Sequence, residues 1–190
     1  MPISTTELNE FLNNHKYARF VHTNLHLHTP ATPWDWDSRE DQTTKAARIT
    51  PEIYFEALNR TSLELVAITD HNSVNWCQTL ISLAKLARQE GKSSIHVLPG
   101  VEVTTYEGPH LLAIFDESKE IEELRLMIAR LGMSGRGEAA DRVGDKSGRT
   151  VAIKEILSEV DNLGGIVIAP HVNEKDGLWG PKEFKGRKKY

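Results

Sequence analysis

Apolar and polar positions divide the chain into two kinds of alternating segment. Short runs rich in β-branched and other apolar residues predict strands, and longer segments with apolar positions three or four apart predict helices. The predicted strands span residues 20–27, 65–69, 96–103, 110–115 and 165–171. The predicted helices span residues 51–61, 75–89, 121–131 and 151–163. Because helices alternate with apolar strands, the pattern predicts an α/β fold with a largely parallel sheet covered by helices.

Residues at the ends of these segments agree with the prediction. Thr50 followed by Pro51 is typical of a helix start, because threonine caps the first turn and proline suits the first helical position. Gly91 and the pair at 164–165 follow predicted helices, as expected of helix ends. A short turn at 107–109 joins the third and fourth predicted strands.

Composition and charge narrow the class of protein. The 190 residues are 39% hydrophobic and 26% charged, which predicts one globular domain with a real core. We place this core at about 17–179, followed by a basic tail at 180–190. The net charge of -4 means that the chain as a whole does not attract nucleic acid electrostatically. A local positive patch could still hold a nucleic-acid substrate.

Cysteine use and hydropathy indicate the compartment. Cys77 is the single cysteine, so no internal disulfide can form and a reducing compartment is expected. The chain starts without a basic and apolar leader, and no apolar run approaches a membrane span. We therefore expect a cytoplasmic protein without a membrane partner.

Histidines gather at the ends and starts of predicted strands. The five that do so are His26, His28, His71, His110 and His171. His26 and His28 are two residues apart on a strand, so their side chains should share one face. Each of these positions, taken singly, is more often incidental or structural than metal-binding.

Two carboxylates accompany the histidines. Asp70 directly follows the apolar strand 65–69, where α/β enzymes place their sites, although it equally suits a helix cap. Glu102 lies within an apolar strand, where a charge is costly unless it is paired or bound to metal. An edge-strand position facing water is the alternative for Glu102, disfavoured by its apolar neighbours. The combination of histidine and carboxylate on five strands predicts a polynuclear metal site at one end of the sheet.

The order of these residues resembles a known family. The chain is similar to the PHP (polymerase and histidinol phosphatase) superfamily. The resembling motifs are Asn24–Thr29, Ile68–Asn72, Pro99–Thr104, His110–Ala113 and Ala169–His171. The resemblance implies a distorted (β/α)7 barrel, of which this chain would form an incomplete front part, with metals at the carboxyl ends of the strands.

The resemblance also implies roles for individual residues. His26 and His28 would bind one metal, Glu102 would bridge two, and His110 and His171 would complete the second. His71 would bind a third metal, with Asp70 orienting it, and Glu102, His71 and Asp70 would serve catalysis. The cofactors implied are two or three divalent ions of zinc, manganese or iron.

The chain also departs from the family pattern. Asn24 stands where the first motif usually has aspartate, and Pro33 and Trp34 occupy the usual positions of a third-metal ligand. Asp35 or Asp37 is the substitute ligand we consider. The closing Asp-x-His motif of the family does not occur by residue 190, so we expect the chain to be the front portion of such a domain.

The activity implied by the resemblance is metal-dependent hydrolysis of a phosphate ester by a metal-bound hydroxide. The substrate would be a nucleotide, a nucleic-acid end or a small phosphorylated metabolite. The candidates for holding phosphate are Arg136, Arg142 and Arg149, for which the alternative is a solvated loop position. Trp34 and Trp36 are candidates for stacking on a base, for which the alternative is a packing role.

Two alternatives stay open. One is a non-catalytic metal-binding module that serves as a scaffold in a larger nucleic-acid-processing protein, including one with a C-terminal ATPase domain. The other is an interaction domain that uses the basic tail.

Overall fold

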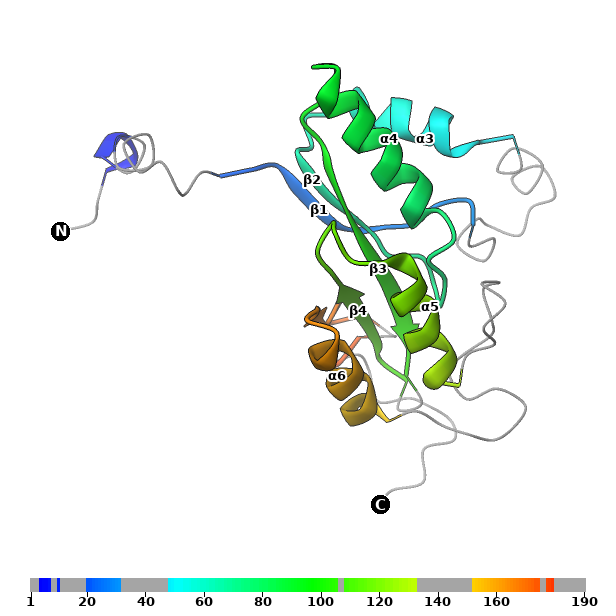
Figure 1. The fold of residues 1–190 in the computed structure, drawn as a ribbon. Coiled ribbons are helices and arrows are strands. Elements are labelled where there is room, and N and C mark those ends of the chain that lie inside the picture. Colours follow the sequence, from blue (N-terminus) through cyan, green and yellow to red (C-terminus); the bar gives the residue numbers. More distant parts are fainter. Residues whose placement is uncertain are drawn as a thin grey trace.

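The computed structural model describes residues 4–7, 10, 20–31, 48–105, 108–132, 152–174 and 177–179. Five strands form one curled sheet, and their order in the sheet follows their order in the chain (Figure 1). The strands are β1 (Thr23–Leu27), β2 (Leu65–Ile68), β3 (His96–Thr104), β4 (His110–Ile114) and β5 (Ile166–Ile168). The helices that connect them are α3 (Pro51–Asn59), α4 (Cys77–Gln89), α5 (Ile121–Arg130) and α6 (Ile153–Asn162).

Four of the five strands run in one direction. β1, β2 and β3 pair in parallel, whereas β4 is antiparallel to both β3 and β5. The predicted α/β class and mostly parallel sheet are therefore confirmed, with one reversal at β4. The reversal follows from the short connection at residues 105–109, because a parallel pair needs a crossover of a dozen residues or more.

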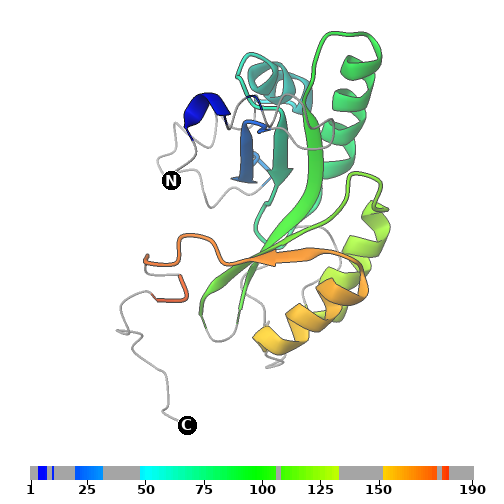
Figure 2. The ribbon, with the colours of Figure 1, turned by 90° about the vertical axis from the view of Figure 1, so that its left-hand side faces the viewer.

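The helices pack mainly on one side of this half-barrel. Figures 1 and 2 both place α4, α5 and α6 on the same face of the curled sheet. The main core lies between this face and the helices, and it includes Val66, Ile68 and Val97 from strands and Leu80, Leu124 and Ile156 from helices. A smaller cluster on the other face contains Ala67, Leu112 and Ile114. Apolar residues on both faces of β2 explain why its sequence lacks the alternation of a half-exposed strand.

The ends of the elements follow local chemistry. The Thr50 side chain accepts a hydrogen bond from the Ile53 N–H, and Pro51 occupies the first turn of α3, as predicted. Gly91, with a φ of 68°, follows α4. β5 is shorter than its predicted run of 165–171, because Pro170 lacks the N–H that a sheet ladder needs.

Several residues considered in the sequence lie outside the described part of the chain. They are Pro33, Trp34, Asp35, Trp36, Asp37, Arg136, Arg142, Arg149 and the basic tail at 180–190. No helix among the described residues is both long and apolar enough to span a membrane.

Candidate metal centre

A single buried carboxylate stands at the centre of the candidate site. Glu102 lies near the carboxyl end of β3, the middle strand of the sheet, and is 1% exposed. Its backbone pairs with Leu112 of β4 on one side and forms a bridge with His71 on the other. An apolar strand thus carries one carboxylate into a position enclosed by both neighbouring strands.

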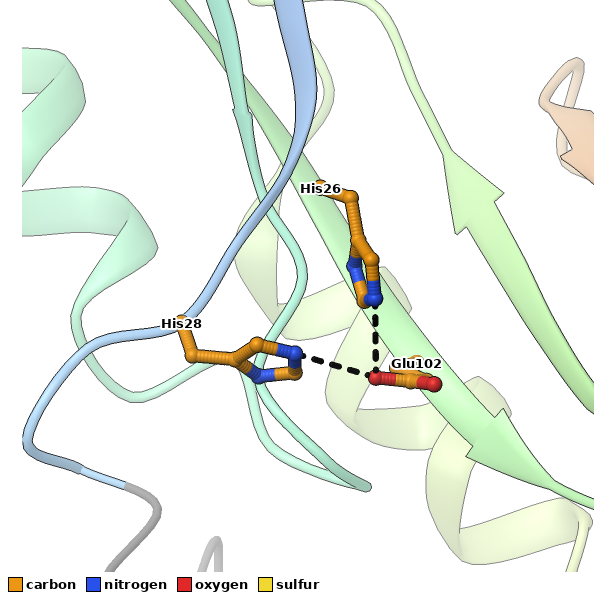
Figure 3. A group of neighbouring side chains, drawn as sticks. All are labelled: His26, His28 and Glu102. Carbon is orange, nitrogen blue, oxygen red and sulfur yellow. Dashed lines mark ion pairs between the residues drawn. The ribbon is translucent and has the colours of Figure 1, made fainter. Parts of the chain in front are cut away.

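Five imidazoles converge on this carboxylate from separate parts of the chain. The Nε2 atoms of His26, His28 and His71 lie 3.5, 3.1 and 3.6 Å from Glu102 Oε2. The other two imidazoles lie against Glu102 Oε1, with His110 Nδ1 at 2.6 Å and His171 Nε2 at 3.3 Å. Figure 3 shows His26 and His28 turned toward the same oxygen of Glu102.

The sheet topology explains the convergence. The carboxyl ends of parallel strands meet at one edge, which brings His26, His28 and His71 beside Glu102. β4 runs the other way, so its first residue, His110, lies at this same edge. His171 follows the end of β5, which runs parallel to β3.

The backbone around His26 departs from regular pairing. The register of β1 against β2 shifts between Asn24 and Leu27, and the Asn24 side chain accepts a hydrogen bond from the His26 N–H. Asn24, which stands where the motif that this segment resembles has aspartate, therefore stabilises the turn of the chain at His26. His26 Nδ1 lies 2.9 Å from Thr69 Oγ1, and that hydroxyl is also 3.4 Å from the Leu27 carbonyl. If Thr69 donates to Leu27, Nδ1 of His26 is the donor to Thr69, which leaves the lone pair of Nε2 facing Glu102.

The segment after His28 is bound to β2 and α3. The Thr29 N–H and hydroxyl donate to the two carboxylate oxygens of Asp70, each at 2.6 Å. The Tyr54 hydroxyl donates to the His28 carbonyl at 2.9 Å. Asp70 is fully buried, so its carboxylate holds the chain that carries the histidines.

The loops that carry His71 and His171 contain unusual backbone conformations. Asn72 has a φ of 49°, and its N–H donates to the Glu102 carbonyl at 2.9 Å. His171 has a φ of 31°, a strained region for a side chain of its size. Strained residues held by surrounding structure cluster at functional sites. The His171 carbonyl accepts from the Glu174 N–H at 2.8 Å, which closes a turn around it.

Charge at the centre favours an ionised carboxylate and a neutral imidazole. Burial alone would raise the pKa of Glu102, but the hydrogen bond from His110 and the imidazoles of His28, His71 and His26 hold it well below its usual range. Burial lowers the pKa of His26, and the neighbouring histidines add to this effect against the attraction of Glu102. Carboxylate and neutral imidazole are the forms that bind metal.

The donor set fits a divalent metal. Glu102 Oε2 is buried and accepts no hydrogen bond from the described residues, yet three Nε2 atoms surround it. A divalent cation among them would bind the carboxylate oxygen and the imidazole lone pairs together. Two groups of three ligands lie close enough to share an ion. They are His26, His28 and Glu102, and His71, Glu102 and His110. Imidazole with carboxylate suits zinc, manganese or iron.

The structure thus brings together all six predicted metal ligands. The assignment of each to a particular ion stays a prediction, as do the catalytic roles of His71 and Asp70. The sequence analysis did not identify Tyr54, because this residue lies on a helix and belongs to none of the five motifs. It also gave no role to Thr69, although Thr69 lies within the PHP-like segment Ile68–Asn72.

A surface hollow of about 500 Å³ lies elsewhere, between α6 and β5. Its lining includes Leu157, Asp161 and Val167 and none of the six candidate ligands.

Comparisons with known proteins identify the fold. No family model and no curated protein matches the chain. A structure of endonuclease Q in complex with a 27-mer duplex substrate bearing an abasic lesion superposes with a TM-score of 0.55 at 15% identity. A structure of endonuclease Q from Pyrococcus furiosus superposes with a TM-score of 0.53 at 14% identity. Each match covers 83% of this chain and 36% of the other, so the chain spans about a third of those proteins.

A third structure, from Bifidobacterium adolescentis and provisionally described as a metal-dependent phosphoesterase, matches with a TM-score of 0.47 at 19% identity. That match covers 81% of this chain and 68% of the other. At 14–15% identity the endonuclease Q structures show a likeness of the fold alone, and the resemblance to the PHP superfamily rests on the order of the five motifs.

Proposed function

We propose that the chain forms the metal centre of a metal-dependent phosphoesterase. The observation that carries the proposal is the convergence of five histidine nitrogens on the buried carboxylate of Glu102, within 2.6–3.6 Å. A buried carboxylate with so many imidazoles is costly to build for stability alone, because each polar group must be desolvated.

The residues of the chain have distinct tasks in this proposal. Glu102 belongs to both groups of three ligands, with Oε2 nearest His26, His28 and His71 and Oε1 nearest His110 and His171, so it would be shared by two metal positions. His26 and His28 hold one position, and His71 and His110 lie at the other, with His171 beside it. Metals bound there supply an activated water and neutralise charge on phosphoryl oxygens.

The substrate class is part of the proposal. A phosphate ester presents anionic oxygens that a dinuclear centre attracts. The fold likeness to endonuclease Q makes DNA the first polymer to test, beside small phosphate monoesters and diesters. The scaffold alternative shares the metal centre but predicts no turnover.

The test is hydrolysis with added metal. The 190-residue chain, loaded in turn with Mn²⁺, Zn²⁺ and Fe²⁺, is assayed on p-nitrophenyl phosphate, its bis-ester and a duplex containing an abasic site. We expect one of these to be hydrolysed, and Glu102→Gln to lower the rate by about 100-fold or more.

The matched control is His96→Ala. His96 is also a strand histidine, but it pairs with Glu117 at 3.2 Å and has no contact with the cluster. It should keep the rate of the parent chain. Activity that survives Glu102→Gln or a chelator contradicts the proposal, and metal binding without any turnover favours the scaffold.

A further inference from the structure

The side chain of Tyr54, on α3, forms a hydrogen bond to the segment that carries His28. Its hydroxyl donates to the His28 carbonyl at 2.9 Å. The phenol ring meets the ring of Trp76 edge to face, with centroids 6.0 Å apart. Such aromatic contacts favour one ring position, so packing against Trp76, directly before α4, orients the hydroxyl.

The acceptor belongs to a peptide group that is held on both sides. The His28 carbonyl and the Thr29 N–H are the two ends of one peptide plane. Tyr54 binds the carbonyl end, and Asp70 Oδ1 binds the N–H end at 2.6 Å. With both ends held, the plane cannot rotate, and the backbone dihedral angles on either side of it are fixed.

The orientation of this plane decides where the His28 imidazole points. The side chain leaves the backbone at the Cα atom that begins this peptide, so a displacement of the peptide moves the base of the ring. His28 Nε2 is the closest of the three imidazole nitrogens to Glu102 Oε2, at 3.1 Å. A small displacement of this peptide would therefore change the distance between His28 Nε2 and Glu102 Oε2.

Tyr54 remains a donor over the working pH range. Burial, and secondarily the charge of Asp70, raises the pKa of its hydroxyl to about 12.

We propose that Tyr54 is a positioning residue of the metal centre, which acts with Asp70 to fix the peptide between His28 and Thr29. This role rests on the proposed function, because it takes His28 to be a metal ligand. Tyr54 touches neither metal nor substrate in this account.

The first experiment measures metal affinity. Co²⁺ is titrated into the 190-residue chain and followed by its visible absorption, for the parent and for Tyr54→Phe. Tyr54→Phe keeps the ring against Trp76 and removes one oxygen. We expect its Co²⁺ dissociation constant to rise about tenfold, the size of effect seen when groups behind a metal ligand are lost.

The matched control is Asn59→Ala on the same helix. Asn59 Nδ2 also donates to a backbone carbonyl, that of Lys92 at 3.1 Å, away from the cluster. Both variants should unfold at similar temperatures without metal, and only Tyr54→Phe should lose affinity. Equal Co²⁺ affinity in Tyr54→Phe and the parent overturns the positioning role.

A second readout needs no metal. We expect the Thr29 amide to exchange its hydrogen about tenfold faster in Tyr54→Phe than in Asn59→Ala, because the carbonyl side of the peptide is released. Unchanged Thr29 exchange also overturns the role. A parent chain that binds no Co²⁺ instead contradicts the proposed metal centre, and the exchange result then still decides whether Tyr54 holds this peptide.

Discussion

At the scale of single residues, Glu102 shows why a buried charge is informative in a sequence. A carboxylate within the apolar strand 96–103 indicates a paired or metal-bound group, and the structure encloses it at 1% exposure. The histidines were predictable for the same reason, because strand ends of one sheet meet at one edge. Thr29 and Thr69 were not, since hydroxyls that hold a ligand in place leave no pattern of their own.

Acid should destabilise the metal-free chain in two stages. Burial is the main cause that lowers the pKa of His26 from 6.5 in the folded chain. Because the unfolded chain then binds this proton more tightly, His26 contributes to folding stability above pH 6.5, and the contribution is lost as the pH falls below that value. The depressed pKa of Glu102 acts in the same direction below about pH 4.5. Urea unfolding at pH 7.5, 6.5, 5.5 and 4 should show a falling midpoint.

His26→Gln is the control, because it removes the first titrating group. Its midpoint should fall less between pH 7.5 and 5.5 than that of the parent. A parent midpoint that stays level or rises over this interval would contradict the burial of His26.

Cys77 should be inert while the chain is folded. The thiol is fully buried at the start of α4, and burial raises its pKa to about 12. At pH 8 its thiolate fraction is then on the order of 10⁻⁴. Ellman's reagent should react with it only after urea is added. Rapid labelling of the folded chain would show that α4 does not cover it.

At the scale of elements, the helices were predicted to within two residues at either end. Periodicity and end signals decide these segments locally, as Thr50 and Pro51 do for α3. The reversal of β4 follows from a short turn that the sequence already contained. The contact of Tyr54 with His28 could not be predicted, because it depends on the position of α3 relative to the end of β1 and not on the sequence of either segment alone.

The turn after β5 offers a test of the strained His171. A Cβ on Gly177 would lie 2.2 Å from the His171 carbonyl oxygen and 2.6 Å from the Val172 carbonyl carbon. Neither backbone atom can yield without moving His171. Gly177→Ala should therefore weaken metal binding by about tenfold and cost about 1–3 kcal/mol of stability.

Gly91→Ala is the comparison for this variant. Gly91 has a φ of 68° but open space around its Cβ position, so alanine there costs backbone strain away from the site. Calorimetric titration with Mn²⁺ should find parent affinity in Gly91→Ala. Parent affinity in Gly177→Ala as well would mean that His171 does not contribute to the centre.

At the scale of the whole molecule, the centre joins all five strands of the half-barrel. His26 lies on β1 and His28 directly follows it. His71 follows β2, and Glu102 lies on β3. His110 opens β4, and His171 follows β5. The alternation of apolar strands with helices predicted the mostly parallel sheet, and the histidines and carboxylates at strand ends predicted where they would gather. The number of strands in a (β/α)7 barrel stays a prediction. A ligand that binds this junction should stabilise the sheet as one unit.

Metal should therefore raise the thermal midpoint of the chain. At 100 times the dissociation constant, binding adds about 2.7 kcal/mol. For a chain of 190 residues this corresponds to a rise of roughly 5–10 °C. Glu102→Gln should lose the rise and His96→Ala should keep it, in scanning calorimetry with and without Mn²⁺. An equal rise in Glu102→Gln would place the bound metal elsewhere.

The central claim is that Glu102 and its histidines hold metal, and anomalous diffraction from crystals soaked in Mn²⁺ tests it most directly. We predict one anomalous peak among His26, His28 and Glu102 and another among His71, Glu102 and His110, each about 2.0–2.3 Å from its ligand atoms. Anomalous density that is absent from this cluster, with the side chains in place, would contradict the account.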